Sequence, residues 1–378
     1  MRIGLAATLL LLITCLGAAS PQGDGSRPRR VSPDTDEQQL KLQSDLVTLT
    51  VSVTDSAGHP MPGLSPESFR VFEDEKTQRI DYFEPVGDPY SLMLVLDTSG
   101  STMDQLAKMR SAAREFVDGL GPKDQIGIIS FSRGIDLHGN LTSDRQELYR
   151  HIDDVAASRA RRPGAPRFDE STGTSFYDAL YLACAESPLA EVESTGRKAI
   201  IVFSDCVDST SAYRYRDIVD AVERSGDSVY FLLFDTKDFS DRLLTAGDDE
   251  QYRINFSRSQ LERFYDEYEH DAPDRDRDPQ DYTTLERLEI NSALYELAGQ
   301  QANAIAGRTG GRVYPVRSIG DLGAAYREIA AELRTRYAIG YYPSNSKHDG
   351  TWRKLRVTVV GKPGAVVITR SGYWAPKD

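Results

Sequence analysis

Three uninterrupted apolar runs constrain the fold of this chain more than any other feature. They cover residues 92–96, 199–203 and 229–234, and each lies between polar residues. Such a run is typical of a parallel strand that is buried on both faces of a sheet. The segments between the runs carry apolar residues at helical spacing, and further strands are predicted at residues 126–131, 135–137 and 313–316. Strands that alternate with helices predict a doubly wound, mostly parallel α/β sheet.

Strands of a different type are predicted on both sides of this α/β region. Polar and apolar residues alternate along residues 46–54, and again along residues 355–359. This period of two is typical of strands with one buried face. Neither flank has enough strands for a stable two-sheet core. We therefore expect residues 45–89 and 336–378 to pair into one small β-sandwich, with the α/β domain, residues 90–335, inserted between its two halves.

A hairpin is predicted within the first half of this sandwich. Residues 69–72 and 80–83 are apolar segments that flank a charged turn near residues 73–76. Two short strands joined by a turn normally pair with each other.

The first 19 residues are typical of an export signal. Arg2 precedes an apolar run from Leu5 to Leu16, and small residues follow at 17–19. The run is shorter than the ~20 residues that span a bilayer, which favours a cleaved signal peptide over an anchor. A lipoprotein signal cleaved before Cys15 is the less favoured alternative, because Thr14 is an unusual neighbour. We expect a flexible linker at residues 20–44, no transmembrane anchor after cleavage, and a periplasmic or extracellular location.

Negative charge is concentrated in one segment. The chain has 45 basic and 58 acidic residues, and its net charge of −13 argues against nucleic acid as a partner. Residues 236–290 contain 16 acidic and 8 basic side chains, so this segment contributes eight of the net negative charges. It also interrupts the alternation of strands and helices. We interpret it as an acidic insertion with a short helix near residues 261–268, placed to attract cations or to repel wrong partners.

Oxygen-bearing side chains lie on three of the predicted loops. Asp97, Ser99 and Ser101 come directly after the first apolar run, Asp205 follows the run at 199–203, and Thr174 precedes a predicted helix. The carboxyl ends of parallel strands meet at one edge of a sheet, where ligands bind. Carboxylates and hydroxyls are hard ligands that suit Mg²⁺ or Mn²⁺ better than zinc. The competing interpretation is that Ser99 and Ser101 only cap the helix at residues 104–119.

This combination resembles the von Willebrand factor type A domain, which has a Rossmann-like fold. Asp97, Ser99 and Ser101 match its D-x-S-x-S motif, Thr174 matches its threonine, and Asp205 matches its final aspartate. In that family these residues form a metal-ion-dependent adhesion site, where Mg²⁺, or Mn²⁺ or Ca²⁺, accepts an Asp or Glu carboxylate from a protein partner. The resemblance therefore implies cell adhesion or protein binding and no enzyme activity. The flanking segments at residues 51–55 and 337–343 also resemble an exported acidobacterial subfamily.

The sequence departs from the family pattern at Cys206, where glycine is common. Cys206 and Cys184 are the cysteines that remain after signal cleavage. In an oxidising compartment they are able to pair, but the sequence equally allows two separate thiols.

Two other functions remain open at this stage. One is a structural envelope component that has lost metal use. The other is a Mg²⁺-dependent phosphatase-like hydrolase with Asp97 as its nucleophile. Such hydrolases usually carry a second acid two residues later, and here that residue is Ser99. We therefore favour the binding module.

Overall fold

The central sheet of the protein has the doubly wound form that the sequence predicts. A computed structural model describes residues 46–85, 89–102, 105–160, 173–192, 197–245, 255–268, 277–317 and 319–377. The predicted signal peptide and linker lie outside these residues. The six strands run in the order β10 (Val313–Val316), β9 (Ser228–Phe234), β8 (Lys198–Ser204), β5 (Ser91–Asp97), β6 (Gln125–Phe131) and β7 (Ile135–Leu137). All neighbours are parallel except β7, which is antiparallel to β6.

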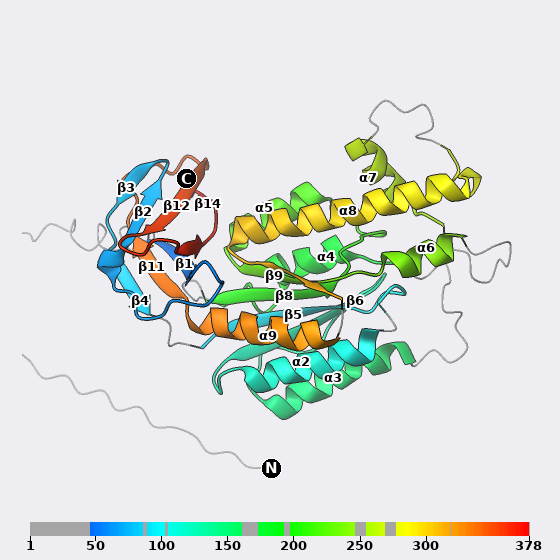
Figure 1. Cartoon of the computed structure of the whole chain (residues 1–378), viewed down its shortest axis with the longest axis horizontal. Helices are drawn as coiled ribbons and strands as arrows, with labels where there is room; N and C mark the ends of the chain where they lie inside the picture. Colours follow the sequence, from blue (N-terminus) through cyan, green and yellow to red (C-terminus); the bar gives the residue numbers. More distant parts are fainter. Residues whose placement is uncertain are drawn as a thin grey trace, which may run out of the picture. The chain divides into compact units, whose positions relative to one another are not determined.

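Helices cover both faces of this sheet, as Figure 1 shows. One face packs against α2 (Leu106–Gly119), α3 (Arg145–Ala160) and α9 (Ile319–Arg334). The other packs against α4 (Phe176–Tyr181), α5 (Tyr215–Ser225) and α8 (Thr284–Thr309). The residues of β5 are all buried, which explains why its sequence is apolar throughout.

Strands from the two ends of the chain form a β-sandwich, as predicted. One sheet has the order β13 (Val366–Ile368), β1 (Val47–Thr54), β11 (Tyr337–Tyr341) and β4 (Tyr82–Pro85). The other has the order β14 (Gly372–Trp374), β12 (Trp352–Val359), β2 (Phe69–Glu73) and β3 (Lys76–Gln78). The inward side chains of both sheets form one apolar cluster. The α/β domain is therefore inserted into the sandwich.

The predicted hairpin is only half correct. β2 turns back into β3, whereas β4 crosses to the other sheet and pairs with β11. Phe83 of β4 accounts for this crossing. Its ring lies 5.5 Å from that of Phe69 and 5.7 Å from that of Tyr337, measured between centroids, so β4 contributes to the sandwich core from the opposite sheet.

The acidic insertion has a folded core of its own. It contains α6 (Lys237–Thr245), the predicted short helix as α7 (Arg258–Tyr268), and the first turns of α8. Their apolar side chains form a separate cluster: Leu244, Phe256, Leu261, Tyr265, Tyr282, Ile290 and Leu294. A Thr283–Glu286 capping box begins α8. The insertion is therefore built onto the long helix α8 instead of hanging from the domain as a loop.

Within the described residues, no helix is both long enough and apolar enough to cross a bilayer.

Candidate metal centre

The loop that follows β5 brings its three predicted ligands together. The Asp97 side chain is fully buried, and its Oδ1 accepts a hydrogen bond from the Ser99 backbone N–H at 2.8 Å. The Ser99 and Ser101 hydroxyl oxygens lie 3.1 Å apart. Helix α2 begins later, at Leu106, with Gln105 at its N-cap. Neither serine is at the cap position, so the competing cap interpretation is wrong for this helix.

Asp205, at the end of β8, joins this cluster. Its Oδ2 accepts a hydrogen bond from the Ser101 hydroxyl at 2.8 Å. The Ser204 hydroxyl donates to Asp97 Oδ2 at 2.5 Å, so the ends of β5 and β8 are linked twice. Parallel strands place these loops at one edge of the sheet, as the sequence argument requires.

Thr174 lies on the neighbouring loop, directly before α4. Its backbone is bound to the segment after β8, with its N–H donating to Ser209 Oγ at 2.8 Å and its carbonyl accepting from Ser209 N at 2.8 Å. Across the part of the chain that the structure describes, no partner is assigned to the Thr174 hydroxyl. No described hydrogen bond joins Thr174 to Asp97 or Asp205, so its role as the fifth ligand stays a prediction.

Two carboxylates are buried together, and no cationic side chain among the described residues compensates them. Asp97 is 0% exposed and Asp205 is 3% exposed, and neither forms an ion pair with a described lysine, arginine or histidine. Burial, together with the Asp205 charge, raises the pKa of Asp97 to about 7. Burial also raises the pKa of Asp205. A pair of this kind is electrostatically unfavourable by itself and suits a divalent cation.

The donor set is consistent with this interpretation. No three His, Cys, Asp or Glu side chains gather in a metal-binding arrangement anywhere among the described residues. The candidate centre therefore depends on hydroxyl groups beside two carboxylates, which is a donor set for a hard cation.

Two residues of the site were not found by sequence reasoning. Thr236 follows β9 and donates its hydroxyl to Asp205 Oδ2 at 2.5 Å. The Tyr295 hydroxyl, from the middle of α8, lies 2.7 Å from the Thr236 hydroxyl. The position of Thr236 just after a buried strand was a usable signal, whereas nothing in the sequence around Tyr295 indicates this contact. Through these two hydroxyls, α8 helps to orient Asp205.

Asp208, three residues after Asp205 in the chain, does not add an uncompensated negative charge near the site. Asp208 forms an ion pair with Arg263 of α7, so its charge is compensated. Burial raises the pKa of Asp208, and the Arg263 guanidinium opposes that rise.

Cys206 occupies an unusual backbone position next to the site. Its φ is 61°, a left-handed conformation that favours glycine, which fits the preference for glycine at this place. Cys184 and Cys206 are both buried and both free, so the disulfide alternative is not realised in this structure. Burial raises the pKa of both thiols well above the usual range.

This burial leads to a prediction about reactivity. We expect Cys184 and Cys206 to resist iodoacetamide at pH 8 in the folded protein, because alkylation requires an accessible thiolate. Both should react fully in guanidinium. Peptide mapping by mass spectrometry measures the two sites separately, and rapid alkylation of Cys206 in the native protein would contradict its burial.

Comparison with known protein families identifies part of the α/β domain. A family model described as "von Willebrand factor type A domain" matches residues 92–207. Residues 92–207 are a von Willebrand factor type A domain. This match includes all five predicted ligands, and the remaining strands and helices of the α/β unit extend beyond it. The search of curated proteins gives no match.

Several solved structures resemble the von Willebrand factor type A domain and its surroundings at low identity. One is the conserved hypothetical protein BatB from Bacteroides thetaiotaomicron, at 18% identity over 64% of this chain and 98% of that chain, with a TM-score of 0.39. Another is a von Willebrand factor type A protein from Catenulispora acidiphila, at 11% identity over 88% and 74% of the chains, with a TM-score of 0.37. A third is proximal thread matrix protein 1 from the mussel byssus, described with a zinc-occupied MIDAS motif, at 15% identity over 66% and 49%, with a TM-score of 0.35.

Proposed function

We propose that this chain is an exported protein-binding module that captures a carboxylate of a partner protein through a divalent cation. Asp97, Ser99, Ser101, Thr174 and Asp205 would hold the cation, directly or through water. The observation that carries this proposal is the buried pair Asp97 and Asp205, which has no described cationic partner and is surrounded by hydroxyls. Mg²⁺ is the first candidate, with Mn²⁺ and Ca²⁺ as alternatives.

The cation would supply an electrophilic position for one further oxygen ligand. The protein groups would do the rest: the two carboxylates balance its charge, and the hydroxyls fix its place at the edge of the sheet. A partner that presents an Asp or Glu side chain fits such a position, because carboxylate oxygen is a preferred ligand of hard cations. No covalent step is needed, which agrees with a binding function instead of catalysis.

Metal addition and removal test the proposal directly. We expect millimolar Mg²⁺ to raise the melting temperature of the wild type, since a ligand that binds only the native state stabilises it. EDTA should remove this increase and should also release captured partners in a pull-down from the native envelope. Partner capture that persists in EDTA would contradict the binding mechanism, and a metal-independent melting temperature would favour the structural alternative.

The contact between Thr236 and Asp205 gives a sharper prediction. Thr236→Val keeps the side-chain shape but removes the hydroxyl that orients the Asp205 carboxylate. We expect the Mg²⁺ affinity to fall by about 10-fold, which is the usual lower range for losing a group that orients a metal ligand. Thr245→Val, an exposed change on α6, is the matched control. Equal Mg²⁺ affinities for both variants by calorimetry would exclude this role of Thr236.

A further inference from the structure

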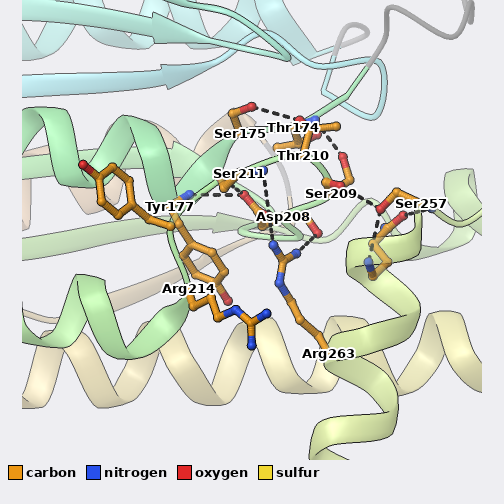
Figure 2. A network of polar contacts seen from close by, with 12 residues as sticks. Thr174, Ser175, Tyr177, Asp208, Ser209, Thr210, Ser211, Arg214, Ser257 and Arg263 are labelled. Carbon is orange, nitrogen blue, oxygen red and sulfur yellow. Dashed lines mark hydrogen bonds and ion pairs between the residues drawn. The ribbon is translucent and has the colours of Figure 1, made fainter. Parts of the chain in front are cut away.

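The acidic insertion makes direct contact with the loop that holds Thr174 in place. This loop is the segment at residues 208–211, and it lies between Thr174 on one side and Ser257 and Arg263 of the insertion on the other, as Figure 2 shows. On one side, Ser209 and Thr210 donate their backbone N–H groups to the Thr174 carbonyl, at 2.8 and 3.2 Å. The Ser209 hydroxyl accepts from the Thr174 N–H on the same side. Both polar groups of the Thr174 backbone are therefore bound to this segment.

On its other side, the same segment is bound by two residues of the insertion. Arg263 of α7 donates from Nη1 to the Asp208 carbonyl at 2.6 Å and forms an ion pair with the Asp208 carboxylate. The Ser257 hydroxyl donates to the Ser209 carbonyl at 2.7 Å. Two successive carbonyls of the segment are thus held by side chains from outside the von Willebrand factor type A match.

These contacts are buried and closely fitted. The Asp208 side chain is 1% exposed and that of Arg263 is 19% exposed. The guanidinium carbon of Arg263 also lies 5.0 Å from the ring centroid of Tyr177, at the start of α4. A Cβ atom at Gly173 would approach Thr210 Cγ2 to 2.5 Å, so Gly173 packs closely against this segment. A buried, charge-assisted network of this kind holds its members in one arrangement.

We propose that Arg263 and Ser257 are positioning residues for Thr174, so that the acidic insertion sets the metal affinity of the site at its edge. This inference rests on the proposed metal function. The insertion acts through two relays, from Arg263 to Asp208 and from Ser257 to Ser209, and both end at the Thr174 backbone. Without them the Thr174 hydroxyl loses its fixed place, although all five ligands remain.

Point variants test this role better than deletion of the insertion, residues 236–290, which would remove six of the seven buried residues of its apolar cluster. Ser257→Ala removes one relay. The double variant Arg263→Met with Asp208→Asn removes the other without leaving a buried unpaired charge. Ser259→Ala on α7 and the exposed Arg242→Met on α6 are matched controls. Each variant is first shown to be folded by circular dichroism, and Mg²⁺ affinity is then measured by calorimetry well below the melting temperature.

We expect the double variant to bind Mg²⁺ about 10-fold more weakly than wild type, and Ser257→Ala to bind several-fold more weakly. Arg263→Lys, which keeps the charge but not the second hydrogen bond, should lie between wild type and the double variant. The controls should match the wild type. The decisive readout is the combination with Thr174→Ala: if the insertion acts through Thr174, the double variant causes no further loss in that background.

Two results would overturn the inference while leaving the metal site intact. One is a Mg²⁺ affinity within twofold of wild type for both relay variants. The other is an undiminished loss in the Thr174→Ala background, which would show that the insertion acts elsewhere. If the wild type binds no Mg²⁺, Mn²⁺ or Ca²⁺ at all, the proposed function fails and this inference fails with it.

Discussion

Asp97→Asn is expected to abolish Mg²⁺ binding and, in metal-free buffer at pH 7.5, to give a protein that melts at a higher temperature than the wild type. The first effect follows from removing a charged oxygen from the ligand set. The second follows from the burial of Asp97 beside Asp205, which makes the ionised pair unfavourable when no cation compensates it. Asparagine keeps an acceptor for the Ser99 N–H and carries no charge. Asp97→Asn should therefore abolish metal binding and at the same time stabilise the metal-free protein.

The difference in stability between Asp97→Asn and the metal-free wild type should increase as the pH rises. Burial and the Asp205 charge raise the pKa of Asp97 in the folded protein from 3.8 to about 7. A raised carboxyl pKa contributes stability that is fully present below about pH 4, where folded and unfolded states are both protonated. That contribution is lost as the pH rises toward 7 and above. Each pKa unit corresponds to about 1.4 kcal/mol, so the metal-free wild type should lose a few kcal/mol relative to the variant between these limits.

Added Mg²⁺ should stabilise the wild type but not Asp97→Asn, so the difference in stability between the two proteins should shrink or reverse. At pH 7.5, Mg²⁺ at 100 times its dissociation constant stabilises the native state by about 2.7 kcal/mol. At pH 5 the cation must displace a proton from Asp97, so the Mg²⁺-induced increase in melting temperature should shrink. Asp97→Asn should show no Mg²⁺ effect at either pH.

Thermal melts of wild type and variant, with Mg²⁺ or EDTA, measure all of these effects. Asp220→Asn, an exposed aspartate on α5, is the control for removing one charge and should behave as wild type. A Mg²⁺ response that survives in Asp97→Asn would exclude Asp97 as a ligand. A variant that is less stable than wild type in EDTA would show that the buried pair is not strained.

The parallel sheet was predictable because burial on both faces leaves a distinct signal in the sequence. The five central residues of β5 and of β8 are all apolar, and a run this short between polar residues favours a buried strand over a helix, which is normally longer. The partners of short strands were harder to predict. The three polar residues of β3 carry no hydrophobic pattern. The sheet to which β4 belongs depends on the contact of Phe83 with Tyr337, which is more than 250 positions away in the chain.

The candidate site also contains residues that were predictable from the sequence and residues that were not. Asp97 and Asp205 were predictable because both follow buried strands, and topology alone brings the ends of such strands together. Tyr295 and Arg263 were not, because each reaches the site from a helix whose place depends on the packing of the insertion. Sequence reasoning therefore finds residues that line the edge of a sheet, and it overlooks residues that hold those residues in position.

The second large effect is expected at the opposite edge of the sheet, where Arg336 connects α9 to β11. Its side chain is 1% exposed, and its guanidinium donates to Ser228 Oγ at 2.7 Å and to the Gly310 carbonyl at 2.8 Å. It also forms a 3.0 Å ion pair with Glu332. Arg336→Met should destabilise the protein by about 3–5 kcal/mol, because losing one partner of a buried ion pair leaves the other charge poorly compensated.

Guanidinium unfolding with three variants separates this charge effect from a packing effect. Arg334→Met, two residues earlier and exposed, should change stability by no more than about 0.5 kcal/mol. Glu332→Gln combined with Arg336→Met should recover part of the loss, since without Arg336 the buried Glu332 carboxylate keeps only the ion pair with Arg312, at 3.1 Å, and is less well compensated. A loss that the second substitution does not reduce would assign the effect to packing. Because Ser228 is the first residue of β9, and the proposed ligands Asp97 and Asp205 lie at the opposite ends of the strands, Arg336→Met should leave the Mg²⁺ affinity of the folded protein unchanged. Stability and metal binding would then be separately adjustable at the two edges of one sheet.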